Sequence, residues 1–152
     1  MAIVFVPGQV AVGDPSPTGP TPNSNDKDVH VKVVKLTSAN FTVTTSTKTL
    51  VAVLPADASI LKFEYWNKTK LAGGSVATAT LSLGTTSGGT EFVNAFDVFT
   101  TVSTAAMLTP VTGIVQNYGI PLGADIPIYA TGLTTTGSPT SGEVYVYIYY
   151  VR

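Results

Sequence analysis

The stretch that decides the fold of this 152-residue chain is Val144-Tyr145-Val146-Tyr147-Ile148-Tyr149-Tyr150-Val151. Successive side chains of a β-strand point to opposite faces, so one face is aliphatic and the other carries Tyr145, Tyr147 and Tyr149. No charged residue lies within the stretch. At an exposed sheet edge such a strand would promote aggregation. The sequence therefore predicts a strand covered on both faces, inside a β-sandwich or by another subunit.

The same period of two recurs in segments that extend back to residue 29. Glycine-rich turn signals such as Gly73-Gly74 and Ser87-Gly88-Gly89 separate the segments. No window suits a long amphipathic helix, and residues 102–108 are the best candidate for a single helical turn. The predicted strands are 29–36, 41–44, 50–54, 60–66, 76–83, 92–99, 113–116, 126–130 and 144–151.

These strands predict an all-β, jelly-roll-like β-sandwich of about eight strands, with another Greek-key sandwich as the alternative. The alternation within 60–66 places Leu61, Phe63 and Tyr65 on one face of their strand and Lys62 on the opposite face. The sandwich domain is predicted to span residues 29–152.

Residues 1–28 form a predicted extended arm, because their many prolines and glycines remove strand donors and leave too little apolar surface to fold alone. Such an arm is ordered only where it is tied down. We expect it to lie along another surface, of its own domain or of a partner. Its predicted anchor is Ile3, Val4, Phe5, Val6 and Pro7.

The composition excludes many functions. The formal net charge is -1 and only 11% of residues are charged, against about 25% in an average domain. This gives no electrostatic basis for binding nucleic acid or a membrane, and no stretch is apolar enough to span a bilayer. There is no cysteine and one histidine. We therefore expect no metal, no cofactor and no enzymatic activity. The low charge predicts a protein that works within an assembly, with a soluble monomer as the alternative.

The remaining polar groups have structural interpretations. His30 lies in an alternating strand, with no catalytic partner near it in sequence. Glu91 and Asp97 are too far apart along one strand, about 20 Å, to act as a glycosidase pair. The segment 23–28 is predicted to be a polar linker rather than a calcium loop, and 84–90 a hairpin turn. The tyrosines are predicted to pack in the sandwich or at a subunit interface, with a sugar-binding platform as the alternative.

Two stretches carry a resemblance to a known family. The first stretch is Leu54-Pro55-Ala56-Asp57-Ala58-Ser59-Ile60-Leu61, and the second is Leu81-Ser82-Leu83-Gly84-Thr85-Thr86-Ser87-Gly88-Gly89-Thr90-Glu91-Phe92-Val93-Asn94-Ala95. Together they resemble the jelly-roll cement, or decoration, proteins of tailed-bacteriophage heads. The motifs mostly encode strand, turn and strand, and the resemblance covers about residues 50–151.

The resemblance implies a homotrimer, made in the host cytoplasm, that binds the outside of the virion capsid and locks major capsid protein subunits together. Tyr145, Tyr147 and Tyr149 would then form the threefold contact, and the anchor of the arm would contact the capsid or a neighbouring subunit. The alternatives are a tail-fibre or spike domain that recognises a cell-surface glycan through tyrosines and Trp66, and a polysaccharide depolymerase.

Overall fold

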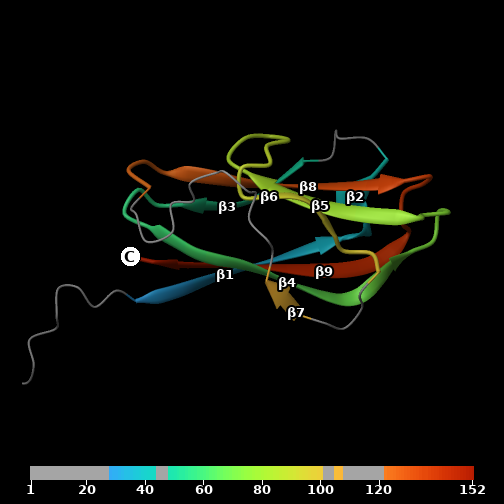
Figure 1. Cartoon of the computed structure of the whole chain (residues 1–152), viewed down its shortest axis with the longest axis horizontal. Helices are drawn as coiled ribbons and strands as arrows, with labels where there is room; N and C mark the ends of the chain where they lie inside the picture. The colour runs from blue at the N-terminus through green and yellow to red at the C-terminus, as the bar shows by residue number, and fades with distance from the viewer. Residues whose placement is uncertain (1–27, 44–47, 101–104, 108–121) are drawn as a thin grey trace, which may run out of the picture.

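Two stacked β-sheets make up the computed structural model, which describes residues 28–43, 48–100, 105–107 and 122–152 (Figure 1). A single 3₁₀ turn, η1 (Ser38–Asn40), accompanies the strands of the described residues. The strands are β1 (Val29–Thr37), β2 (Phe41–Thr42), β3 (Lys48–Leu54), β4 (Ser59–Ala72), β5 (Thr78–Gly84), β6 (Val93–Asp97), β7 (Ala105–Met107), β8 (Ile126–Thr135) and β9 (Ser141–Val151).

The strand order identifies a jelly roll. One sheet has the order β1-β9-β4-β7, and the other has β2-β8-β5-β6 with β3 also paired to β8. The first half of the chain therefore pairs with the second half in reverse order: β1 with β9, β3 with β8, β4 with β7 and β5 with β6. This is a long hairpin wrapped into two sheets, and it confirms the predicted all-β jelly-roll-like sandwich.

The C-terminal strand β9 lies in the middle of the first sheet, with its backbone paired to β1 on one side and β4 on the other. Its inward side chains, Val144, Val146 and Ile148, are fully buried. Its outward tyrosines are only half-buried in the single chain. The strand is therefore protected at both backbone edges, as predicted, but within this chain it is fully covered on one face only.

The core lies between the two sheets and is aliphatic with aromatic contacts that cross the gap. Phe63 of β4 packs against Phe92 at a ring-centroid distance of 5.2 Å, and Tyr65 meets Phe96 of β6 at 4.9 Å. Full burial of one such large apolar side chain contributes about 1.5–3 kcal/mol. Several of these contacts join opposite sheets, so they set how the two layers are placed.

Two details differ from the sequence-based predictions. A β-bulge in β4 turns Leu61 outward, where it is 39% exposed, so Ile60 instead joins Phe63 and Tyr65 in the core. Residues Ala105–Met107, inside the predicted helical turn, pair as strand β7 with β4. The predicted helical turn is therefore wrong at its centre, because pairing with β4 gives these backbone groups partners that a short local turn lacks. The predicted strand 113–116 and the arm lie outside the described residues.

Candidate interaction surface on the first sheet

The outward side of the first sheet brings together residues from three distant parts of the chain. Three cross-strand rows run from β1 through β9 to β4. We call this surface the tyrosine face. Its rows are Lys35, Tyr145 and Trp66; Val33, Tyr147 and Glu64; and Val31, Tyr149 and Lys62.

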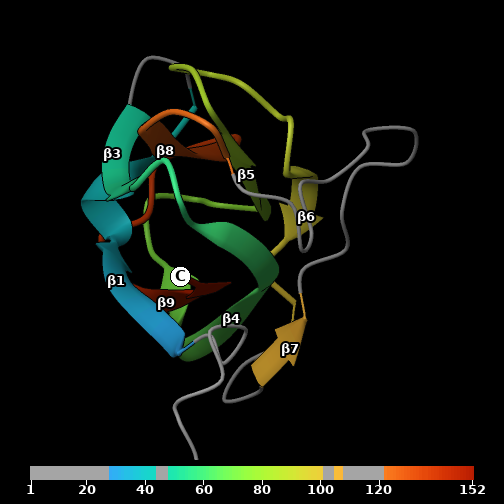
Figure 2. The ribbon, with the colours of Figure 1, turned by 90° about the vertical axis from the view of Figure 1, so that its left-hand side faces the viewer.

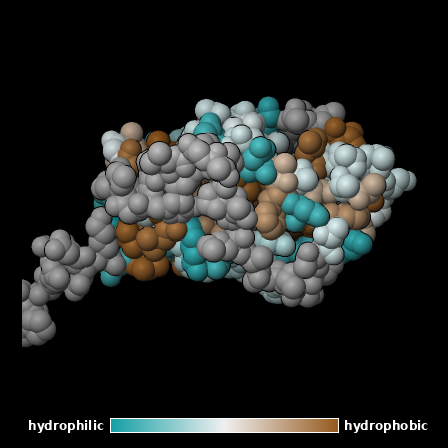
Figure 3. All heavy atoms as spheres, viewed as in Figure 1, coloured by the Kyte–Doolittle hydropathy of each residue, from teal (hydrophilic) through white to brown (hydrophobic). Residues whose placement is uncertain are grey.

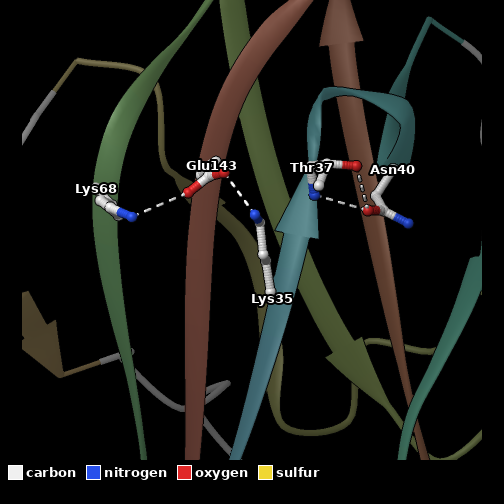
Figure 4. Close-up of polar contacts among 5 residues, drawn as sticks. All are labelled: Lys35, Thr37, Asn40, Lys68 and Glu143. Carbon is white, nitrogen blue, oxygen red and sulfur yellow. Dashed lines mark hydrogen bonds and ion pairs between the residues drawn. The ribbon is translucent and has the colours of Figure 1, made fainter.

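The first row is held by an ion-pair bridge across three strands (Figure 4). Glu143 of β9 pairs with Lys35 of β1, and its second oxygen lies 3.4 Å from the Nζ of Lys68 of β4. The hydrogen bond with Lys35 is the main reason why the pKa of Glu143 lies below its ordinary value and the pKa of Lys35 above its own. Beside the bridge, the rings of Trp66 and Tyr145 pack with centroids 5.7 Å apart.

The third row has a second ionic cluster. The Nζ of Lys62 lies 2.9 Å from Glu64 and 4.5 Å from the ring centre of Tyr149. Hydrogen bonds from Lys62 and then Tyr149 lower the pKa of Glu64, and the bond to Glu64 raises the pKa of Tyr149. A cation over an aromatic ring is stabilised by the ring quadrupole. Tyr149 is therefore engaged by its own chain on one ring face and at its hydroxyl.

Tyr147 occupies the middle row and differs from its two neighbours. The rings of Tyr145 and Tyr149 each have a ring or cation partner, namely Trp66 and Lys62. Within the described residues no such partner faces the ring of Tyr147, which lies between Val33 and Glu64. A half-buried tyrosine with an open ring suits contact with another molecule, since tyrosine is enriched at protein interfaces.

The turn after β1 connects this face to the second sheet. The side-chain oxygen of Asn40 accepts a hydrogen bond from the backbone N–H of Thr37 at 2.8 Å (Figure 4). Its amide donates to the hydroxyl of Thr49 on β3 at 2.9 Å. Thr37 is the residue that ends β1, so this network fixes where the chain leaves the first sheet.

The charge on the first sheet is one-sided. Five of the eight basic residues of the chain lie on β1 and β4, whereas β1, β4 and β9 together carry two carboxylates, Glu64 and Glu143. The strands β3, β5 and β8 of the other sheet carry one lysine and no carboxylate. On the tyrosine face itself, the lysines Lys35 and Lys68 pair with Glu143, and Lys62 pairs with Glu64. The face is therefore aromatic, with its lysines held in ion pairs.

The other polar groups singled out in the sequence have structural contacts. His30 is half-buried and stacks on Tyr150 with ring centroids 5.2 Å apart. Glu91 accepts a hydrogen bond from the backbone N–H of Thr85 and closes the β5–β6 connection, where the hairpin turn was predicted. Burial opposes ionisation of Asp97, but hydrogen bonds from Phe99 and Thr100 outweigh it and lower the pKa of this carboxyl.

The described part of the chain has no pocket that could enclose a small molecule and no group of three potential metal ligands. None of its helices is long or apolar enough to cross a bilayer. The described surface therefore offers contact area rather than an enclosed site.

The sequence predicted Tyr145, Tyr147 and Tyr149 as one surface, and the structure places them together. It did not predict that the valines of β1 join them: Val29, Val31 and Val33 are 61%, 46% and 51% exposed. Alternation in β1 indicated two faces but did not indicate which face turns inward. In the structure, the buried Leu36 marks the inner face.

Hydrophobic surface is visible near the end of the molecule where β1 begins (Figure 3). The predicted anchor residues Ile3, Val4, Phe5, Val6 and Pro7 lie outside the described residues.

Comparison with known proteins adds the fold relationship. No family model and no curated protein matches the sequence. Among solved structures, a chain of the Cyanophage Pam1 capsid asymmetric unit is similar with a TM-score of 0.59 and 18% identity, over 86% of this chain and 89% of that chain. A chain of the Ralstonia phage GP4 capsid aligns with a TM-score of 0.48, 15% identity and coverage of 87% and 88%. A chain of the acidic stable capsid structure of Helicobacter pylori bacteriophage KHP30 aligns with a TM-score of 0.42 and 9% identity, over 84% of this chain and 94% of that chain. The protein shares its fold with the Pam1 capsid chain.

Proposed function

We propose that this protein is a structural virion component, a capsid cement or decoration protein that binds the outer surface of a phage head and stabilises the shell. The observation that carries the proposal is the shared jelly roll with a chain of the Cyanophage Pam1 capsid asymmetric unit, which extends over 86% of this chain. The tyrosine face supports it, because it adds exposed valines to half-buried tyrosines, and a protein that acts by contact needs such a surface.

The mechanism is linkage between binding and assembly. A molecule that binds the assembled shell but not the separated subunits stabilises the shell by mass action. The proposed partners are the major capsid protein, which this mechanism requires, and further copies of the chain in a homotrimer, which the resemblance to cement proteins implies. In the proposal the arm, through Ile3–Pro7, holds the protein to the capsid or to a neighbouring subunit. The tyrosine face forms the contact between copies.

The tyrosine face suits a protein partner better than a glycan. A sugar stacks on an open aromatic face, and Trp66 with Tyr145 is the pair that favours this alternative. The Nζ of Lys68 lies 5.8 Å from the ring centre of Tyr145, and Lys62 covers one face of Tyr149. Of the three tyrosines of this face, Tyr147 alone has no such ring or cation partner among the described residues, so a stacked sugar chain has few open rings to bind.

The test is a binding experiment with phage particles that lack the protein. Purified wild-type chain should bind them in hundreds of copies and raise the temperature at which the shells open. A variant lacking residues 1–25 should keep the far-ultraviolet spectrum of a folded β-domain and lose attachment. A few tens of copies per particle, located on a fibre or tail in an electron-microscopy map, would contradict the proposal and favour the glycan-binding alternative.

A further inference from the structure

The exposed apolar residues of the described structure gather on one side of the sandwich. Strands β1 and β3 border that side, and β6 and β7 border the opposite side (Figure 2). Six of the seven exposed large hydrophobic residues belong to the segment from β1 to β3, and β6 carries none. We call this surface the β1 edge. The six are Val29, Val31, Val33, Val43, Leu50 and Val53.

The backbone of the β1 edge is open as well. Within the described residues β1 pairs with β9 alone, so one side of β1 has no strand beside it. An edge strand with unpaired N–H and C=O groups is a template for another strand. Native proteins usually protect such an edge, and exposed valines beside it increase the need for cover. This combination points to an added strand rather than to a flat side-chain contact.

The charges of the β1 edge restrict which strand fits. Residues 29–54 contain three lysines and no carboxylate. A second copy of β1 would bring its own Lys32 and Lys35 alongside the first pair, and like charges on adjacent strands destabilise the pairing. The best occupant is apolar, suited to a strand and free of positive side chains.

We infer that the β1 edge binds residues Ile3–Val6 of a second copy of this chain as an additional strand. This deepens the proposed function, on which it rests, by assigning a receptor to the arm. Residues 1–12 contain no charged side chain, and Ile3-Val4-Phe5-Val6 is their strand-forming run. The later part of the arm is unsuited because prolines recur in it and cannot donate to a ladder. Those prolines are Pro15, Pro17, Pro20 and Pro22.

The length of the arm makes exchange between copies possible. Val6 is separated from Val29 by 22 residues, which span up to about 75 Å when extended. Proline-rich segments favour extended conformations at about 3.1 Å per residue, so a linker of this length and composition can reach the β1 edge of another copy. A strand added by a neighbour would cover the exposed valines of one copy and link copies around the oligomer.

Disulfide trapping in the purified full chain tests this directly, because the chain has no cysteine of its own. We would mix a Phe5→Cys chain with a Val33→Cys chain, oxidise the mixture and identify heterodimers by intact mass. The matched control replaces Val33→Cys with Asn94→Cys, an exposed position on β6 at the opposite side. Circular dichroism of each variant verifies folding. We expect the Phe5→Cys chain to form a disulfide-linked heterodimer with the Val33→Cys chain. With the Asn94→Cys chain we expect only the small amount of heterodimer that random collision gives.

Three outcomes would overturn the inference. Equal trapping with both partners would show that the β1 edge is not selected. A Phe5→Cys, Val33→Cys double variant that closes only within one chain would show that each arm covers its own edge. Trapping of Phe5→Cys to capsid protein alone, on particles, would show that the arm binds the shell instead. Particle attachment measured on wild type is independent of these results, so failure here can be distinguished from failure of the proposed function.

Discussion

The two sheets of this protein have similar inner faces and very different outer faces. The inner faces of both are mostly apolar and buried, with fully buried residues such as Ile148 in the first sheet and Ile128 in the second. Outward, the first sheet carries tyrosines, lysines and exposed valines. In the second sheet, β5 and β8 turn mostly hydroxyl side chains outward, such as Thr78, Thr80 and Thr135, and the exposed apolar residues Leu50 and Val53 lie on its edge strand β3. The difference teaches that packing between the sheets accounts for their inner faces, whereas the tyrosines and valines on the outer face of the first sheet need a separate explanation.

The largest expected effect separates the two faces of β9. Ile148→Ala should lower the free energy of unfolding by about 2–5 kcal/mol, because it leaves a cavity between the sheets. Ile128→Ala should do the same from the second sheet. Tyr147→Ala changes the residue adjacent to Ile148 in β9, a tyrosine whose side chain points outward, and should lower the free energy of unfolding of the isolated chain much less. Chemical denaturation at concentrations where the chain is monomeric measures all three, and equal losses at Ile148 and Tyr147 would show that the outer face also holds the fold.

The next effect compares the two outer faces through a matched pair of tyrosines. Tyr147 lies on the first sheet and Tyr129 on the second, and both are half-buried. If the tyrosine face joins the copies, Tyr147→Ala should cost about 2 kcal/mol of association, roughly 30-fold in the dissociation constant. Tyr129→Ala should leave the mass in solution unchanged.

Mass measurement by light scattering or analytical ultracentrifugation decides between the two faces. A wild-type chain that stays monomeric at micromolar concentration would show that the tyrosines serve only their own sheet. A loss of mass with Tyr129→Ala but not with Tyr147→Ala would move the contact to the second sheet.

The sequence could predict the features that depend on neighbouring residues, but not those that depend on pairing between distant segments. The strand β9 and the grouping of its tyrosines follow from local alternation, which a single segment displays. The bridge of Lys35, Lys68 and Glu143 does not, because it forms only after β1, β4 and β9 pair across long stretches of chain. The bulge at Leu61 shifts the inward pattern of β4 by one residue, and periodicity alone contains no signal for it.

The same reasoning applies to two other segments. In β1 both sets of alternating positions contain valine, so Val29 and Val34 are equally plausible as core residues until the second sheet is in place. The strand β7 has only three residues and is stabilised by pairing with β4, so its own sequence is too short to specify it. Long-range pairing, rather than local propensity, decided these outcomes.

The smallest expected effect is a difference in acid sensitivity between the outer faces. Hydrogen bonds from lysines lower the pKa of Glu64 and Glu143 on the first sheet. A carboxyl with a lower pKa in the folded chain adds stability above its unfolded pKa of about 4.3, and that contribution is lost as pH falls through the folded value. In the second sheet, β3, β5 and β8 carry no carboxylate, and the contribution of this kind comes from Asp97 at the end of β6, whose pKa is also lowered.

We therefore expect the stability of the wild type to fall more steeply on acidification below about pH 5 than that of the Glu64→Gln, Glu143→Gln double variant. The effect should be small, since both ion pairs are partly exposed and salt screens them. The double variant should keep some acid dependence, because Asp97 also has a lowered pKa in the folded chain. Urea denaturation at a series of pH values gives the slopes. Parallel slopes would mean that the cross-strand bridges add no stability, and that the lysines and glutamates of the tyrosine face are there for a partner alone.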